Sequence, residues 1–177
     1  MKKLLVAVAS VLVAAATYGQ GQVTFQNFDA LTDATKGAIY RPGGSVGAGA
    51  GFNAQLFLVG ANNALTALTP ATTFFTDAGA EFLLNPVDVT VSGVLGGSTA
   101  TFLVRAWDGT SYDSALTAHG ESQTFSMALG GDPGNGGAPT PPTPTVFQTF
   151  SMVPVPEPST IALGLLGAGA LLLRRRK

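Results

Sequence analysis

The chain has 177 residues, of which 9 are basic, 10 are acidic and none is cysteine. The lack of cysteine excludes disulfides, thiol catalysis and cysteine-ligated zinc, so an exported form would depend mainly on core burial for its stability. Six of the nine cations lie in the first three or the last four residues, which leaves three cations against nine acids, a net charge of −6, in residues 20–152. That charge repels phosphate backbones and predicts no nucleic-acid partner.

The N-terminal segment predicts a secretory signal peptide over residues 1–19. Two lysines open the chain, residues 4–16 are apolar, and a triplet with small residues in its first and third positions follows. This pattern favours cleavage before Gln20, with cleavage after Ala16 or Gly21 as alternatives. A permanent transmembrane helix is less favoured because the apolar run is short.

Residues 20–131 carry a two-residue alternation of apolar and polar side chains, which is typical of half-buried strands. In residues 52–59, for example, Phe52, Ala54, Leu56 and Leu58 share one face. With glycine, asparagine and proline turns between the runs, the pattern predicts an all-β fold, a single antiparallel β-sandwich of jelly-roll-like form. The glycine-dense segment 41–51 is predicted to be a mobile loop. The predicted strands are 23–26, 52–59, 71–76, 87–91, 100–107 and 121–127.

A Gly-rich and then Pro-rich stretch, residues 132–144, cannot build a core and is predicted to be a loop or linker. Residues 145–152 are predicted to be the last strand of the domain. The sequence Gln123–Met127 recurs as Gln148–Met152, and because both copies alternate alike, they could form neighbouring strands. The alternative is a disordered linker that leads from the domain directly to a membrane anchor.

Residues for catalysis are sparse, so the chain is predicted not to be an enzyme and to hold no cofactor. His119 is the only histidine, and no Gly-x-Ser-x-Gly elbow frames Ser122 or another serine. A glycosidase would need two convergent carboxylates, for which Glu81, Glu121 and the aspartates are the available groups. The sequence gives no distance between them.

One polar segment, Asp108–Asp113, carries two carboxylates and several hydroxyls. Such oxygens could bind Ca²⁺, but the spacing and the distal glutamate of an EF-hand are missing, so a polar hairpin turn is favoured and no metal site is predicted. Trp107 and Tyr112 flank the same turn. They could form a platform for a sugar, but aromatic packing at the edge of a sandwich is the favoured explanation.

The C-terminal segment has the features of a membrane-sorting signal. Prolines at 154, 156 and 158 predict a stiff extended strip over residues 153–158, and Ser159 or Thr160 offers an N-cap for a helix. The apolar run 161–173 spans roughly 20 Å as a helix, a marginal transmembrane length. The cations that follow favour a cytoplasmic end and set the topology; they are Arg174, Arg175, Arg176 and Lys177.

This tail resembles the PEP-CTERM sorting domain, which exosortases recognise in Gram-negative bacteria that make exopolysaccharide. The resemblance rests on the order of the motif, the apolar helix and the basic end within residues 153–177. The motif residues are Val155, Pro156, Glu157, Pro158, Ser159 and Thr160.

The resemblance implies export, a transient stay in the inner membrane, and cleavage near Pro-Glu-Pro by an exosortase, which leaves the domain at the cell surface or in the extracellular matrix. Residues 20–113 also resemble, more loosely, the β-rich domains of many short PEP-CTERM proteins, in Gly21–Asn27, Ala54–Leu56 and Val104–Asp108. The expected role is structural or associated with exopolysaccharide. The alternatives are a carbohydrate-binding surface module, a surface hydrolase and an unprocessed tail-anchored periplasmic protein.

Overall fold

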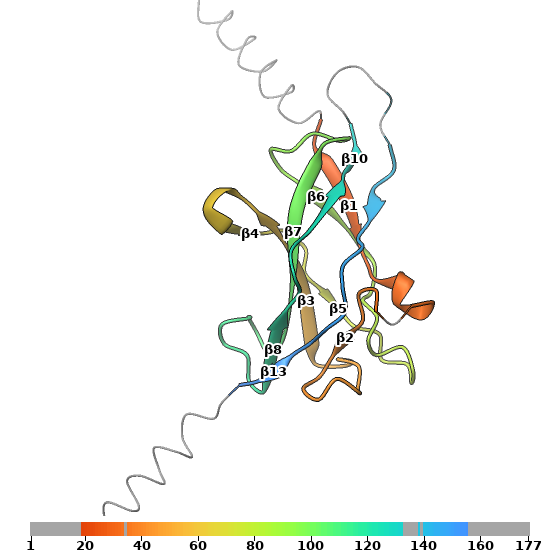
Figure 1. Cartoon of the computed structure of the whole chain (residues 1–177), viewed down its shortest axis with the longest axis vertical. Coiled ribbons are helices and arrows are strands. Elements are labelled where there is room, and N and C mark those ends of the chain that lie inside the picture. The colour runs from red at the N-terminus through yellow and green to blue at the C-terminus, as the bar shows by residue number, and fades with distance from the viewer. Residues whose placement is uncertain (1–18, 34, 133–137, 139, 156–177) are drawn as a thin grey trace, which may run out of the picture.

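Strands make up almost all of the regular structure in the computed structural model (Figure 1), which describes residues 19–33, 35–132, 138 and 140–155. The predicted signal peptide up to residue 18, the apolar run 161–173 and the basic end lie outside the described residues. Within them, no helix is long and apolar enough to cross a membrane. The all-β prediction is confirmed.

The strands form three groups of hydrogen-bonded neighbours. In the first, β1 (Gly21–Phe25) pairs with β6 (Val87–Val91), β10 (Gly130–Gly131) and β11 (Thr143–Pro144). A two-stranded group joins β2 (Ile39–Tyr40) to β12 (Phe150–Ser151). The third contains β3 (Phe52–Val59), β4 (Leu65–Ala67), β5 (Thr72–Thr73), β7 (Thr99–Asp108), β8 (Ala118–Glu121), β9 (Phe125–Ala128) and β13 (Val153–Pro154).

One hydrophobic core draws on both large groups. The buried residues of β1 and β6 include Val23, Phe25, Val89 and Val91, and they join buried residues of β3 and β7 in the same cluster; these are Phe52, Ala54, Leu56, Phe102, Val104 and Ala106. The alternation in the sequence located these faces correctly, because residues two apart in a strand point to the same side. Two short 3₁₀ turns, Phe28–Leu31 and Ala61–Asn63, complete the regular structure.

Most strand pairings are antiparallel, as predicted, but β11 pairs with β1 and β12 with β2 in parallel. β11 lies in the predicted linker, 132–144, and β12 lies in the segment predicted to be a single last strand, 145–152. Instead of forming one strand, residues 143–154 pair with three partners in turn, which are β1, β2 and finally β8. Proline cannot donate to a strand ladder, and the prolines at 142, 144 and 154 shorten each pairing.

The predicted strand 121–127 is divided into β8 and β9 by a bulge. Arg105 lies opposite Glu121, whereas Phe102 lies opposite Phe125, so the strand opposite β7 contains one extra residue. Ser122 occupies the bulge, where its hydroxyl accepts a hydrogen bond from the Val104 N–H at 3.0 Å. A bulge redirects the side chains that follow it.

Segment 41–51 is a loop, as predicted, but it packs against the core instead of standing free. The Arg41 guanidinium donates two hydrogen bonds to the Ala48 carbonyl, at 2.9 and 2.8 Å, and Gly47 and Ala48 are buried. The described domain is elongated (Figure 1): β1 and β10 lie together at one end, while β8 and β13 lie at the opposite end.

Candidate functional site

The described domain ends where the predicted sorting motif begins. In β13, Val153 lies opposite His119 of β8, and Pro154 lies opposite Ala118. Val155 then donates its N–H to the Thr117 carbonyl at 2.8 Å. Val155 is therefore the one predicted motif residue whose position is described; the others lie outside the described residues, namely Pro156, Glu157, Pro158, Ser159 and Thr160 together with Arg174, Arg175, Arg176 and Lys177.

This arrangement separates the fold from the motif. The last backbone hydrogen bond of the described chain is made by Val155, one residue before the Pro-Glu-Pro sequence. Cleavage at or after that sequence removes no described strand and no described residue of the core. The domain can therefore keep its core when the tail is lost.

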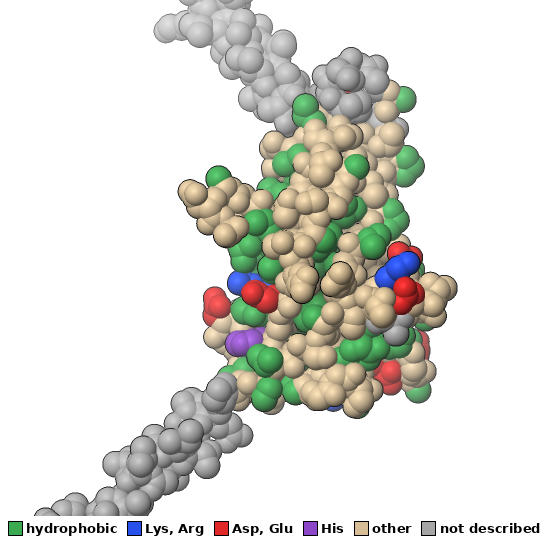
Figure 2. All heavy atoms as spheres, in the orientation of Figure 1, with side chains coloured by type: hydrophobic (Ala, Val, Ile, Leu, Met, Phe, Trp, Pro, Cys, Tyr) green, Lys and Arg blue, Asp and Glu red, His purple; other side chains and the backbone are tan. Residues whose placement is uncertain are grey.

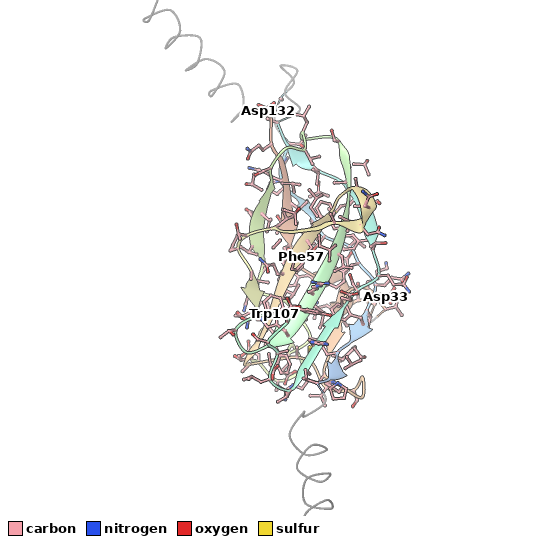
Figure 3. The ribbon with its side chains drawn as sticks, turned by 90° about the vertical axis from the view of Figure 1, so that its left-hand side faces the viewer. Asp33, Phe57, Trp107 and Asp132 are labelled. Carbon is pink, nitrogen blue, oxygen red and sulfur yellow. The ribbon has the colours of Figure 1, made fainter. Side chains whose placement is uncertain are left out.

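The outer face of β3 and β7 carries a cluster of aromatic and charged side chains. Figure 3 labels two of its members, Phe57 and Trp107. Arg105 lies between them on β7, with its guanidinium carbon 5.2 Å from the centroid of Phe57 and 4.3 Å from that of Tyr112. Tyr112 also stacks on His119, with centroids 4.7 Å apart, and meets Trp107 edge-on at 6.4 Å.

The side chains of this cluster pack against one another. Trp107 is only 6% exposed, and its Nε1 has no hydrogen-bond acceptor among the described residues. Burial raises the pKa of Tyr112, the nearby Glu121 raises it further, and Arg105 partly opposes both. Since a sugar platform needs an exposed ring, the packed arrangement favours the edge-packing interpretation for Trp107 and Tyr112.

Asp108 organises the hairpin loop between β7 and β8. Its carboxylate accepts hydrogen bonds from the backbone N–H groups of Leu116, Thr117 and Ala118, at 2.7 to 3.3 Å, and from the Thr117 hydroxyl at 2.6 Å. Burial raises the pKa of Asp108, but these hydrogen bonds outweigh it and hold the pKa below its usual value. The carboxylate thus stabilises a polar turn, as the favoured interpretation of Asp108–Asp113 predicted.

The other polar residues singled out from the sequence have separate partners. His119 lies in strand β8, not in a loop, and its Nδ1 is 3.3 Å from the Tyr112 carbonyl oxygen. Glu121 pairs with Arg105 at 3.1 Å, whereas Glu81 accepts the Gly79 N–H at 2.8 Å. Among the described residues, no group of three or more histidine or acidic side chains could hold a metal ion.

A groove that sequence reasoning missed lies between the two copies of Gln-Thr-Phe-Ser-Met. Its volume is about 730 Å³, and residues 123–125 line one wall while residues 146–149 line the other. The repeat was the available signal, but the two copies are not neighbouring strands, because β9 pairs with β7 and β12 pairs with β2. They face each other across the groove instead.

Comparison with known proteins places the chain among exported proteins that are sorted at a membrane. A family model described as the PEP-CTERM protein-sorting motif matches residues 154–177. The chain therefore carries a PEP-CTERM sorting motif, as its resemblance to that family indicated, and the motif implies exosortase-dependent sorting. No curated protein and no solved structure matches the chain.

Proposed function

We propose that this chain is an exosortase substrate whose β-rich domain is delivered to the cell surface or extracellular matrix of a Gram-negative bacterium, where it has a structural or exopolysaccharide-associated role. The observation that carries the proposal is the PEP-CTERM motif at residues 154–177, directly after the last described strand. The domain is then the cargo and the tail is the sorting signal.

In the proposed mechanism, the signal peptide directs export and the apolar run 161–173 holds the chain in the inner membrane for a time. The cations at 174–177 keep their end in the cytoplasm, because translocating them is unfavourable. Pro156, Glu157 and Pro158 are presented on the periplasmic side as a stiff, extended strip that suits a protease. The exosortase cuts near this strip.

The domain suits a passive role outside the cell. We assign it a β-sandwich of jelly-roll-like form, supported by the larger core cluster, which is shared between β1 and β6 on one side and β3 and β7 on the other. Its stability rests on this core, since the chain has no cysteine. We further propose that it is not an enzyme, because Glu81, Glu121 and His119 are engaged in separate contacts.

The proposal can be tested by changing the motif without touching the fold. Replacing Pro156, Glu157 and Pro158 by alanine removes the strip after the last described hydrogen bond, so the protein should fold but stay with the membrane fraction. Pro141→Ala, at an exposed proline outside the motif, is the matched control and should leave release unchanged.

The test separates the proposal from the tail-anchored alternative. Release of the unaltered chain into the extracellular fraction, lost in the triple variant and in cells without an active exosortase, supports sorting. Equal retention of all variants in the membrane of exosortase-positive cells would mean that the chain is an unprocessed tail-anchored protein.

A further inference from the structure

The groove between the two Gln-Thr-Phe-Ser-Met copies has an aromatic floor. Phe125 from the first copy and Phe147 line the groove with ring centroids 5.8 Å apart, and Phe150, which is not a lining residue, packs on Phe147 at 6.4 Å. Phe147 is 4% exposed and belongs to the core, while Phe125 and Phe150 are half-buried. Phe125 thus offers partly exposed ring surface to the groove, and its contact with the core residue Phe147 holds it in place.

The walls of the groove carry three exposed, uncharged polar side chains beside the exposed Val146. Gln123, Thr124 and Gln148 are exposed and line it. Within the described residues, the side chains of these three make no hydrogen bond to the protein. Two amides, each both donor and acceptor, and one hydroxyl are therefore free to bind a ligand.

Charge at the groove is limited to one cation. Lys36 lies at the rim, where its side chain is 54% exposed and 3.8 Å from the Asp33 carboxylate. On the face shown in Figure 2, charged side chains lie at the middle and lower parts, and the upper half presents hydrophobic and uncharged polar atoms. An anionic ligand would therefore contact one cation, Lys36, whose charge Asp33 partly neutralises, on a domain of net negative charge.

The fold keeps the two walls apart. The bulge at Ser122 redirects residues 123–125. The strand that follows, β9, pairs with β7 and not with the opposite wall. Two backbone hydrogen bonds hold the opposite wall in place. Thr145 donates its N–H to the Thr24 carbonyl, and Thr149 donates its N–H to the Thr35 carbonyl. In Figure 1 the chain from 145 to 151 passes beside the strand that leads up to β10, without joining it.

We propose that this groove binds an uncharged, hydroxyl-rich oligosaccharide. Sugar rings present apolar C–H faces that pack on aromatic rings, and their hydroxyls pair with amide and hydroxyl side chains. The volume of about 730 Å³ lies in the range of pockets that hold small ligands. Because the second wall presents side chains and its backbone N–H groups at 145 and 149 are already bonded, a glycan suits the groove better than an added peptide strand.

This inference rests on the proposed export for its biological setting, but its test does not depend on processing. The full chain, purified in detergent, is titrated by calorimetry with neutral oligomers of glucose, mannose, galactose and N-acetylglucosamine, with oligogalacturonate as the anionic probe. At least one neutral oligomer should bind with a Kd between about 10 µM and 1 mM.

Matched variants locate the site. Gln123→Ala and Gln148→Ala should each weaken binding about fivefold, the effect of losing one hydrogen bond, and the double variant should weaken it more than tenfold. Gln22→Ala, a partly exposed glutamine on β1 outside the groove, should leave the affinity unchanged. Circular dichroism and the fluorescence of the single tryptophan verify that each variant is folded.

Three results would overturn the inference. One is a folded chain that binds none of the neutral oligomers. Another is binding that survives the double variant, which would place the site elsewhere. The third is preferential binding of oligogalacturonate, or of a synthetic peptide with the sequence Gln-Thr-Phe-Ser-Met, which would make the groove an anion or peptide site. None of these results bears on tail cleavage, so the sorting proposal stands or fails separately.

Discussion

Replacement of Asn27 by alanine should destabilise the domain more than a single lost contact would suggest. Asn27 follows β1 and is 2% exposed. Its amide nitrogen donates to the Gly37 and Phe82 carbonyls at 2.7 and 2.9 Å, and its carbonyl accepts the Leu84 N–H at 2.7 Å. One buried side chain therefore joins three chain segments.

The magnitude follows from those three bonds. Leaving a buried donor or acceptor without a partner costs about 1–3 kcal/mol. Three backbone groups lose the Asn27 side chain in Asn27→Ala, and of these the Phe82 carbonyl keeps a second, longer bond from the Ile39 N–H at 3.5 Å. We expect the free energy of unfolding to fall by about 3–6 kcal/mol. With an unfolding entropy of about 2.1 cal/mol/K per residue, this corresponds to a fall in Tm of roughly 10–20 °C.

Urea unfolding measures the change directly. The chain has one tryptophan, Trp107, which is buried, so its fluorescence reports loss of the folded state; circular dichroism supplies the second probe that two-state analysis requires. Asn53→Ala is the control, because Asn53 makes a single hydrogen bond, to the Gly109 carbonyl at 3.0 Å, and should cost about 1 kcal/mol. Equal effects of the two substitutions would refute the reasoning.

Two further substitutions test the loop between β7 and β8 and the packed loop before β3. The pKa of Asp108 is lowered in the folded state despite burial, so its stabilising effect is complete above the ordinary value near 4 and is lost as the pH falls through the folded value. Asp108→Asn should lower the free energy of unfolding by about 2 kcal/mol at pH 7, because charge-assisted bonds such as that from Thr117 are lost. Urea titrations should show the difference between the variant and the unaltered chain closing towards pH 3. A difference that stays constant with pH contradicts the assignment. Gly47→Ala would place a Cβ 2.5 Å from the Phe82 backbone nitrogen and should lower the free energy of unfolding by about 1–3 kcal/mol, whereas Gly60→Ala, where the nearest atom is 3.5 Å away, should change it by less than about 0.5 kcal/mol.

Strands that alternate regularly were predictable from the sequence alone. The predicted strand 87–91 has the same bounds as β6, and 52–59 the same bounds as β3. In both, alternation reflects a single buried face, which any correct pairing must place inward. The local pattern therefore contained the information needed.

The C-terminal half of the domain was less predictable because its partners are distant in sequence. Residues 145–152 alternate like one strand, yet the strand that forms within them is only β12. The strands on either side, which contain Pro144 and Pro154, pair in other sheets. Likewise, nothing local to Glu121–Met127 indicates that Ser122 replaces a backbone partner of Val104. Such bulges and strand exchanges depend on tertiary contacts.

The functional features, like the strands, were predictable where they are local in sequence and not where they depend on tertiary contacts. The sorting motif is linear, so its residues from Pro154 onward could be recognised in sequence and are matched by the family model. The groove is assembled from 123–125 and 146–149, and only the five-residue repeat hinted at a relation between them. Whether Trp107 was exposed or buried depended on Tyr112 folding back onto it, which a pattern of residue types does not encode.

The central claim is that the tail is a processed sorting signal, and mass spectrometry of the C-terminal peptides tests it most directly. Protein recovered from outside native host cells should end near Glu157 or Pro158 and lack the cations at 174–177, while β13 and its preceding chain remain. Recovery of the intact tail through Lys177, confined to the membrane fraction of cells with an active exosortase, would contradict the account.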